Sequence, residues 1–377
     1  MISRVVCFII VIAGALPVSA QVVLRHKQLS ATIEAFGNVT MGIASNNSDD
    51  LGTRDGDLRL DVAVRLLGRI EVAGGPDFGA RIVAQRSPEG GTTIGEASLL
   101  LLGRGGRLEV GERMGLPDVL SGYAPNNFTF TGAEFGPASG PSLDPSGGLQ
   151  TAFFDRSLAA RINSLTALGV ASALFDDQSV KVLYVSPKHR GFLGGISFAP
   201  NADDPRYRDL VQIGLTHERY WSQNVWRWGG SYTYAQGAHT QAGIFDNLNS
   251  LNLGVTTTLS DSLMLGASAT LNSNSGLPRS ASGASPTAWG ITTSVNYNTG
   301  PWTLGAYYQF ARAAFNTPVR ADARLATVEA GLSYRFNTRM RLYGAWFHYD
   351  FSGAYDRAVS ASIHEGDALV AGVRLIL

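Results

Sequence analysis

Apolar and polar residues alternate with a period of two along most of the chain, which is the pattern of β-strands. In segment 58–72, Leu, Val and Ile occupy almost every second position, with Arg, Asp and Glu between them. Segment 251–271 repeats the pattern on both sides of a turn at 260–262, and segment 291–310 repeats it around 298–301. Helical periodicity is nearly absent. The pattern therefore predicts an all-β protein.

Counting such segments predicts about sixteen strands, joined by connections that alternate between short and long. The predicted strands span 31–44, 57–73, 77–86, 96–103, 106–113, 179–186, 190–199, 209–219, 224–236, 248–259, 262–272, 287–298, 301–312, 324–336, 340–351 and 367–377. The short connections fall near 74–76, 104–105, 187–189, 220–223, 260–261, 298–300 and 338, and the long ones are rich in Gly, Asn and Asp. Short turns at one end and long loops at the other are typical of transmembrane β-barrels.

The composition of the two strand faces agrees with a barrel in a membrane. An apolar stretch of about ten residues spans the apolar band of a bilayer when the strand is tilted by about 45°. Aromatic residues cluster at strand ends, as interfacial girdles require: Tyr184, Trp226, Trp228, Tyr232, Tyr234, Tyr297, Trp302, Tyr334 and Phe336. Lipid tolerates no free strand edge, so we expect the last strand, 367–377, to pair with the first, 31–44.

The first twenty residues have the layout of a secretory signal peptide. Arg4 precedes an apolar run from Val5 to Leu16, and Val18-Ser19-Ala20 offers a small-residue cleavage site. The alternative is a buried N-terminal helix. Cys7 is the only cysteine and lies inside this segment, so cleavage would leave residues 21–377 without a thiol. Disulfides and thiolate nucleophiles are then excluded.

Composition and charge favour one continuous β-domain over residues 21–377. The chain has 44 glycines and only 16% charged residues, and no Pro-rich or charged linker divides it. Its formal net charge is zero, which gives no support to nucleic-acid binding. The six histidines show no metal-binding spacing, and we expect no cofactor: His26, His189, His217, His239, His348 and His364.

Several short motifs, in their order along the chain, resemble the general-diffusion porins of Gram-negative bacteria, in particular the sixteen-stranded trimeric porins of proteobacteria. "GRLEVGERMG" is similar to their fifth strand running into the third loop, and "AEFG" (133–136) to an element of that loop. "ARINSL" and "VLYVSPKHRGFLGGISF" are similar to the block that follows the loop, with these residues at matching places: Asn163, Tyr184, Ser186, Pro187, Gly191 and Phe192.

The third long connection, 114–178, is the longest, and loops of such length are usually functional. The resemblance implies that it folds into the barrel and narrows the lumen. It carries the candidate acidic rim Asp118, Glu134, Asp144 and Asp155. Strand parity places a candidate basic wall opposite: Arg59, Arg65, Arg81 and Arg107, with Arg113 at the junction between strand and loop. Opposed rims would set up a field across the constriction. The alternative is that these are ordinary solvated charges of a wet barrel.

These features predict a channel in the outer membrane for passive diffusion of small hydrophilic solutes and ions, in contact with outer-membrane lipid and lipopolysaccharide. The alternatives are a channel selective for a sugar or an anion, and a structural or adhesive barrel with little conductance. An enzyme is disfavoured because the chain contains no G-x-S-x-G motif and no Ser/His pair on one strand face. The resemblance also implies a homotrimer, with its contact on the outer faces of the first five predicted strands, which are rich in Leu, Val, Ile and Ala.

Overall fold

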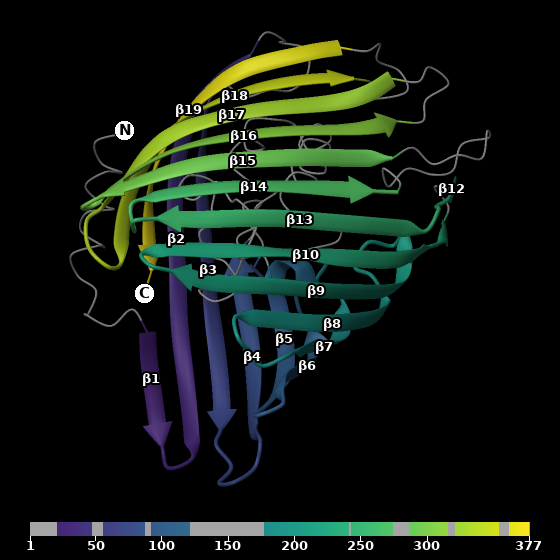
Figure 1. Ribbon diagram of the computed structural model, residues 1–377, viewed down its shortest axis with the longest axis vertical. Coiled ribbons are helices and arrows are strands. Elements are labelled where there is room, and N and C mark those ends of the chain that lie inside the picture. Colours follow the sequence, from purple (N-terminus) through teal and green to yellow (C-terminus); the bar gives the residue numbers. More distant parts are fainter. Residues whose placement is uncertain are drawn as a thin grey trace.

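The computed structural model describes residues 21–46, 56–86, 92–120, 177–240, 243–273, 287–315, 321–353 and 362–376. In these residues the chain forms one large antiparallel sheet, whose strands follow one another in chain order from β2 to β19, except that β11 and β12 form a separate two-stranded sheet (Figure 1). The predicted signal peptide, 1–20, lies outside the described residues.

The described elements are nearly all strands. They are β1 (Gln21–His26), β2 (Leu29–Asn46), β3 (Gly56–Ile70), β4 (Asp77–Arg86), β5 (Thr92–Gly103), β6 (Gly106–Glu112), β7 (Val180–Val185), β8 (Phe192–Asn201), β9 (Tyr207–Trp221), β10 (Asn224–Gly237), β11 (His239–Thr240), β12 (Gly243–Ile244), β13 (Leu248–Leu259), β14 (Leu263–Asn272), β15 (Ala288–Thr299), β16 (Trp302–Phe315), β17 (Ala321–Arg335), β18 (Met340–Gly353) and β19 (Ser362–Ile376). A single short helix, α2 (Leu116–Val119), follows β6 in the described part of the chain. No helix among these residues is long and apolar enough to cross a membrane.

Strand pairing closes the sheet on itself. Each of β2 to β9 pairs with the next strand, β10 pairs with β13, and the series continues to β19. Strand β19 then pairs with β2, from Gly366 opposite Asn46 to Ile376 opposite Phe36. Within the described residues these sixteen strands form a ring without an open edge, which confirms the predicted all-β barrel. The last strand pairs with the first, as lipid requires.

Strand β1 was not predicted, and it adds a short hairpin to the ring. It pairs with β2 from Gln21 opposite Glu34 to His26 opposite Leu29, directly beyond the stretch that β19 occupies. Lys27 has a φ of 52° in the tight turn between them. The sequence analysis also missed α2 and the two-residue strands β11 and β12, which are too short to give a periodic signal.

The connections follow the predicted alternation less strictly than expected. The segments 202–206 and 316–320, on the long side, are no longer than 71–76 and 186–191 on the short side. The turn between β13 and β14 shows how the short side is built, because Ser260 and Asp261 both have positive φ, at 51° and 58°. Two successive residues of this kind are typical of the tight hairpin turns that match strand twist.

The two faces of the ring have opposite chemistry. Apolar side chains are exposed and polar side chains are buried, which is the reverse of the distribution in a water-soluble protein. On β15, Ile291 and Tyr297 are 40% and 47% exposed, whereas Thr292 between them is fully buried at 0%. Large apolar side chains thus point outward and polar ones point into the ring, as a lipid-facing barrel requires. Aromatic pairs lie at both ends of the outer face. Trp302 and Tyr334 are 4.7 Å apart at the short-turn end, and Trp289 and Phe310 are 5.3 Å apart at the other.

Candidate functional site

Five ionisable side chains gather on the lumen side of β4, β5 and β6, and we call them the charged wall: Arg81, Glu96, Arg107, Glu109 and Arg113. All but Arg107 are almost completely buried. Arg113 forms an ion pair with Glu96 through Nη1, and its Nε donates to Glu109 Oε2 at 3.2 Å. Arg107 Nε lies 2.8 Å from Glu109 Oε1. Arg81 Nη1 lies 3.8 Å from Glu96 Oε2 and 3.9 Å from Glu109 Oε2, so it bridges both carboxylates.

Strand register explains why these residues meet. On β6, positions 107, 109 and 111 share the inward face, and Arg113, directly after the strand, continues it. Gly111 lies between Glu109 and Arg113. Gly111 has a φ of 138°, and a Cβ there would lie 2.2 Å from the Ala97 carbonyl oxygen, so only glycine fits. Between β4 and β5 the register shifts, with Val83 opposite Glu96 but Ala84 opposite Ile94. Such a bulge re-aims side chains, and here it places Glu96 beside Arg113.

The charged wall is close to electrically balanced. Its three guanidinium groups face two carboxylates, which leaves one net positive charge. Burying an unpaired charge is costly, whereas a paired charge with good geometry is tolerated. The pairing therefore lets ionised groups remain on a wall that is largely covered. It also means that this wall is far less basic than the arginines alone predict.

Two more of the predicted arginines belong to β3. Arg65 Nε donates to Glu34 Oε2 at 2.7 Å, and the side chains of this pair are 14% and 28% exposed. Arg65 is thus also balanced by a neighbour on the same wall. The backbone of Arg59 lies in β3 opposite Thr40, while its side chain lies outside the described residues.

The described beginning of the third long connection runs along the lumen side of the ring. Leu116, the first residue of α2, donates its backbone N–H to Gln212 Oε1 of β9 at 2.9 Å. Leu116, Val119 and Leu120 form an apolar cluster inside the ring together with two residues of β7, Leu183 and Val185. The chain therefore turns inward directly after Arg113.

Two glycines on the wall make room for this inward segment. A Cβ at Gly195 of β8 would lie 2.7 Å from Leu116 Cδ1, and one at Gly214 of β9 would lie 2.7 Å from Leu120 Cδ1. Side chains at these positions would push α2 away from the wall. The absence of a Cβ lets the segment pack directly on the strands.

The side chains of the predicted acidic rim are not among those that the structure describes. Asp118 lies in α2, but its side chain is not described, and Glu134, Asp144 and Asp155 lie outside the described residues. The structure instead brings Arg65, Arg81, Arg107 and Arg113 together with three glutamates that the sequence analysis did not select: Glu34, Glu96 and Glu109. Glu109 shares strand parity with Arg107 and Arg113, so its position could have been found from the sequence. Glu96 could not, because the bulge precedes it.

A second buried ion pair was also missed, where the third connection returns to the ring. Lys181 of β7 donates to the backbone oxygen of Asp177, and its Nζ lies 3.7 Å from Asp177 Oδ2. Asp177 Oδ1 in turn accepts a hydrogen bond from the backbone N–H of Asp203 at 3.1 Å. This pair anchors the end of the third connection to β7 and to the connection between β8 and β9.

The lumen side of β9 to β16 has a different chemistry at mid-height, and we call it the uncharged wall. Its buried polar residues carry hydroxyl and amide groups, among them Gln212, Ser231, Thr233, Ser250, Asn252, Ser268, Thr270, Thr292, Ser294 and Gln309. Asn252 Nδ2 donates to Thr270 Oγ1 at 2.6 Å, and Ser197 Oγ of the neighbouring strand β8 donates to Gln212 Oε1 at 3.0 Å.

Within the described residues no group of His, Cys, Asp or Glu is arranged to hold a metal ion.

A closed antiparallel ring with an apolar exterior and a charged and polar interior is a membrane-spanning β-barrel channel. The chain belongs to the Gram-negative porin family, whose family model matches residues 7–354. It is therefore an outer-membrane diffusion channel, as the short motifs predicted. A search of curated proteins found no match.

Solved structures of outer-membrane proteins share the fold at low sequence identity. OmpF of Salmonella typhi, solved in complex with daunomycin, is 11% identical with a TM-score of 0.65, covering 94% of this chain and 100% of that chain. OmpT of Vibrio cholerae is 12% identical with a TM-score of 0.58, covering 94% and 100%. A triple mutant of the Rhodopseudomonas blastica porin is 16% identical with a TM-score of 0.55, covering 92% and 100%. At these identities the likeness establishes the fold alone.

Proposed function

We propose that this porin passes small hydrophilic solutes and ions by passive diffusion through a water-filled lumen, without strong preference among them. The reversed burial of the ring carries the proposal, because polar side chains line its interior and apolar ones its exterior. A lumen within sixteen strands is wide enough for water. Catalysis is not part of the proposal, because the wall presents balanced ion pairs and neutral groups rather than an activated nucleophile.

We further propose that the third connection, 114–178, constricts the lumen opposite the charged wall. The inward course of Met114 to Leu120, with α2 packed against β8 to β10, supports this. Asp118, Glu134, Asp144 and Asp155 would then form the acidic rim across from Arg81, Arg107 and Arg113. A transverse field between such rims aligns dipolar solutes and disfavours apolar ones.

The proposed assembly is a homotrimer whose contact lies on the outer faces of β1 to β6. The large exposed apolar residues described there are aliphatic with one exception, Phe78: Leu24, Leu29, Met41, Ile43, Leu66, Ile70, Ile82, Ile94, Leu99, Leu108 and Val110. The outer faces of β9, β10, β15, β16 and β18 carry the exposed aromatics Trp221, Trp226, Trp228, Tyr232, Tyr297, Trp302, Tyr308 and Trp346. Aromatic girdles mark a surface that meets lipid. An OmpT structure of Vibrio cholerae is described as a trimer form.

For localisation, we propose export through a signal peptide, 1–20, cleaved before insertion into the outer membrane. The short turns would then face the periplasm and the long connections the exterior, where they contact lipopolysaccharide.

Single-channel conductance in planar bilayers tests the proposed function. A large ohmic conductance that small sugars and amino acids do not saturate supports passive diffusion. Saturable block by one sugar or one anion would favour a selective channel, for which the neutral hydroxyl and amide groups of the uncharged wall are suitable. No conductance from protein that shows heat-modifiable migration would favour a structural barrel and contradict the proposal.

A further inference from the structure

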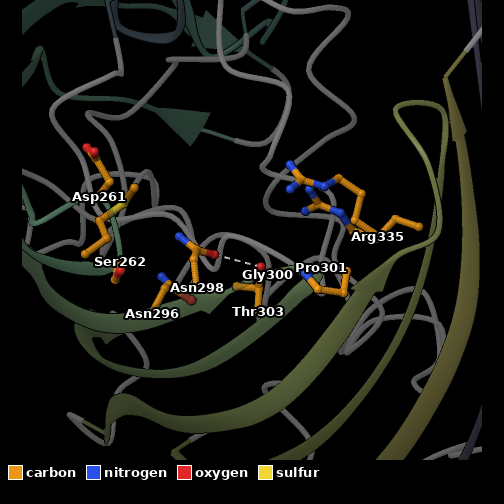
Figure 2. Close-up of a pocket in the computed structure, with 10 residues that line it drawn as sticks. Asp261, Ser262, Asn296, Asn298, Gly300, Pro301, Thr303 and Arg335 are labelled. Atoms are coloured by element: carbon orange, nitrogen blue, oxygen red, sulfur yellow. Dashed lines mark hydrogen bonds between the residues drawn. The ribbon is translucent and has the colours of Figure 1, made fainter.

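A pocket at the short-turn end of the lumen has the chemistry of an anion site. Its volume is about 490 Å³, and it lies between the ends of β14 to β18 (Figure 2). The polar residues that carry the argument are Asn296, Asn298, Thr303, Arg335, Arg341 and Asp261. We propose that this pocket binds the carboxylate or phosphate group of a small anionic solute as it leaves or enters the channel at this mouth.

A row of like charges is the first observation. Arg335 of β17 lies directly opposite Arg341 of β18, and Arg341 lies directly opposite Arg374 of β19. Their strand neighbours Tyr334 and Leu342 belong to the outer face, so the three arginines share the inner face. Like charges directly opposite each other on neighbouring strands destabilise a sheet. Of the three, Arg335 and Arg341 line the pocket, and an oxyanion held between their guanidinium groups would reduce the repulsion and accept paired hydrogen bonds.

Neutral donors complete the site on the other strands. Thr303 Oγ1 donates to Asn298 Oδ1 at 2.8 Å, which turns the amide nitrogen of Asn298 away from that bond and toward the pocket (Figure 2). Asn296 is only 4% exposed. Its Nδ2 has no hydrogen-bond partner among the described residues. A buried donor without a partner is costly, and an anionic oxygen in the pocket would satisfy it.

Asp261 sets a limit on the kind of anion. It lies in the turn between β13 and β14, on the side of the pocket away from Arg335 (Figure 2). Its carboxylate would repel a second acidic group on the solute and attract a cationic one. The site therefore suits solutes that carry a single oxyanion group, including zwitterions.

Binding of inorganic phosphate to the protein in detergent, followed by broadening of the ³¹P resonance, tests the site without requiring conduction. We expect saturable broadening that 1 M chloride suppresses, because the Debye length falls to ~3 Å.

Arg335→Gln should raise the half-saturating phosphate concentration about tenfold, since it removes a charge-assisted hydrogen bond. Arg335→Lys should recover part of the affinity. Displacement of phosphate by gluconate would show that carboxylates bind in the same place.

The matched control is Arg69→Gln. Arg69 lies at the short-turn end of β3, paired with Asp77 at an Nε–Oδ2 distance of 3.1 Å, so the variant removes the same charge at the same mouth. We expect its phosphate binding to match the wild type. Equal loss in Arg69→Gln and Arg335→Gln would mean that only the overall charge matters and would overturn the proposal. Unchanged broadening in the Arg335→Gln/Arg341→Gln double variant would also overturn it. If Arg341→Gln does not fold, the two Arg335 variants decide.

Discussion

The charged wall and the uncharged wall occupy the same ring and obey the same strand parity, yet they satisfy their polar groups in opposite ways. Arg81, Glu96 and Arg113 are held in ion pairs with their neighbours and are nearly fully buried. On the uncharged wall, Asn252 and Thr270 bond each other, whereas the hydroxyl of Ser294 has no hydrogen-bond partner among the described residues. Buried polar groups need partners, and in a wet lumen water supplies them. The charged side depends on charged neighbours, whereas the neutral side depends partly on neighbours and partly on solvent.

This difference has a consequence for ion selectivity. Three arginines against two glutamates leave a small net charge on the charged wall. One substitution there changes both the field at the constriction and the stability of the barrel. A substitution on the uncharged wall changes neither by much. The following variants are designed to break or sharpen this contrast, starting with the largest expected effect.

Glu109→Gln should have the largest effect, because Glu109 contacts Arg81, Arg107 and Arg113. Removing one partner of a buried ion network leaves uncompensated charge and costs about 3 kcal/mol. The unfolding temperature of the barrel in detergent should fall, and the reversal potential across a salt gradient should shift toward anions. Glu71→Gln makes the same chemical change at an exposed position of the connection after β3 and serves as the control. Equal behaviour of the two variants would contradict the structural importance of the network.

The extent to which the sequence predicted this arrangement differs between the fold and the site. All sixteen ring strands were predicted, because the contrast between lipid and lumen imposes a strict alternation on each strand. Glu96 was missed for a physical reason. It follows the bulge at Ala84 and Ile94, and it precedes the run Leu99–Leu102, which is apolar on both faces. Because of these two features, the sequence around Glu96 does not alternate between apolar and polar residues. The face of the strand on which the Glu96 side chain lies therefore cannot be deduced from the sequence.

Glu34 and Glu109 were missed for another reason, since parity alone places both on the lumen side. The acidic residues of the third connection are equally compatible with strand parity as partners for the arginines. Cross-strand partners such as Glu34 and Arg65 become visible only when the register between β2 and β3 is known. The register of neighbouring strands is thus the information that the candidate site needed beyond strand parity.

The next effect concerns the arginines themselves. Neutralising Arg59, Arg65 and Arg81 together should move the reversal potential toward cations, since the acidic groups then dominate the lumen. The shift should shrink as the Debye length falls from ~10 Å at 0.1 M salt to ~3 Å at 1 M. An unchanged reversal potential at low salt would mean that these arginines are ordinary solvated charges.

Single variants of this set separate stability from selectivity. From the sequence, all of these arginines are expected to tolerate neutralisation. The structure divides them: Arg65→Gln breaks a partly exposed pair and should cost about 1 kcal/mol or less. Arg81→Gln leaves two buried carboxylates with one fewer partner and should cost about 2–3 kcal/mol. Unfolding temperatures in the same detergent measure the difference, and equal losses would contradict it.

A smaller effect is expected at the border between the two walls, where α2 packs on β9. Gly214→Val should displace Leu120 and shift α2 toward the axis of the lumen, because an added Cβ would lie 2.7 Å from Leu120 Cδ1. Overpacking of this kind costs about 1–2 kcal/mol. Single-channel conductance should fall while ion selectivity stays the same. At Gly344 of β18, on the outer face away from the proposed trimer contact, an added Cβ lies 3.7 Å from the nearest atom, so Gly344→Val is the control. A conductance equal to wild type in Gly214→Val would mean that α2 does not limit the pore.

The smallest effect is expected from Thr270→Val on the uncharged wall. The variant removes the Oγ1 that accepts a hydrogen bond from Asn252 Nδ2 at 2.6 Å, at a position only 3% exposed. In a dry interior the stranded amide would cost about 1–3 kcal/mol. In a water-filled lumen a solvent molecule replaces the hydroxyl. The free energy of unfolding should therefore fall by no more than about 1 kcal/mol, with a correspondingly small change in the unfolding temperature. Because no charge changes, the reversal potential should equal that of the wild type at 0.1 M salt. A loss of stability comparable to that of Glu109→Gln would mean that this side of the barrel is packed dry, and the contrast between the two walls would not hold.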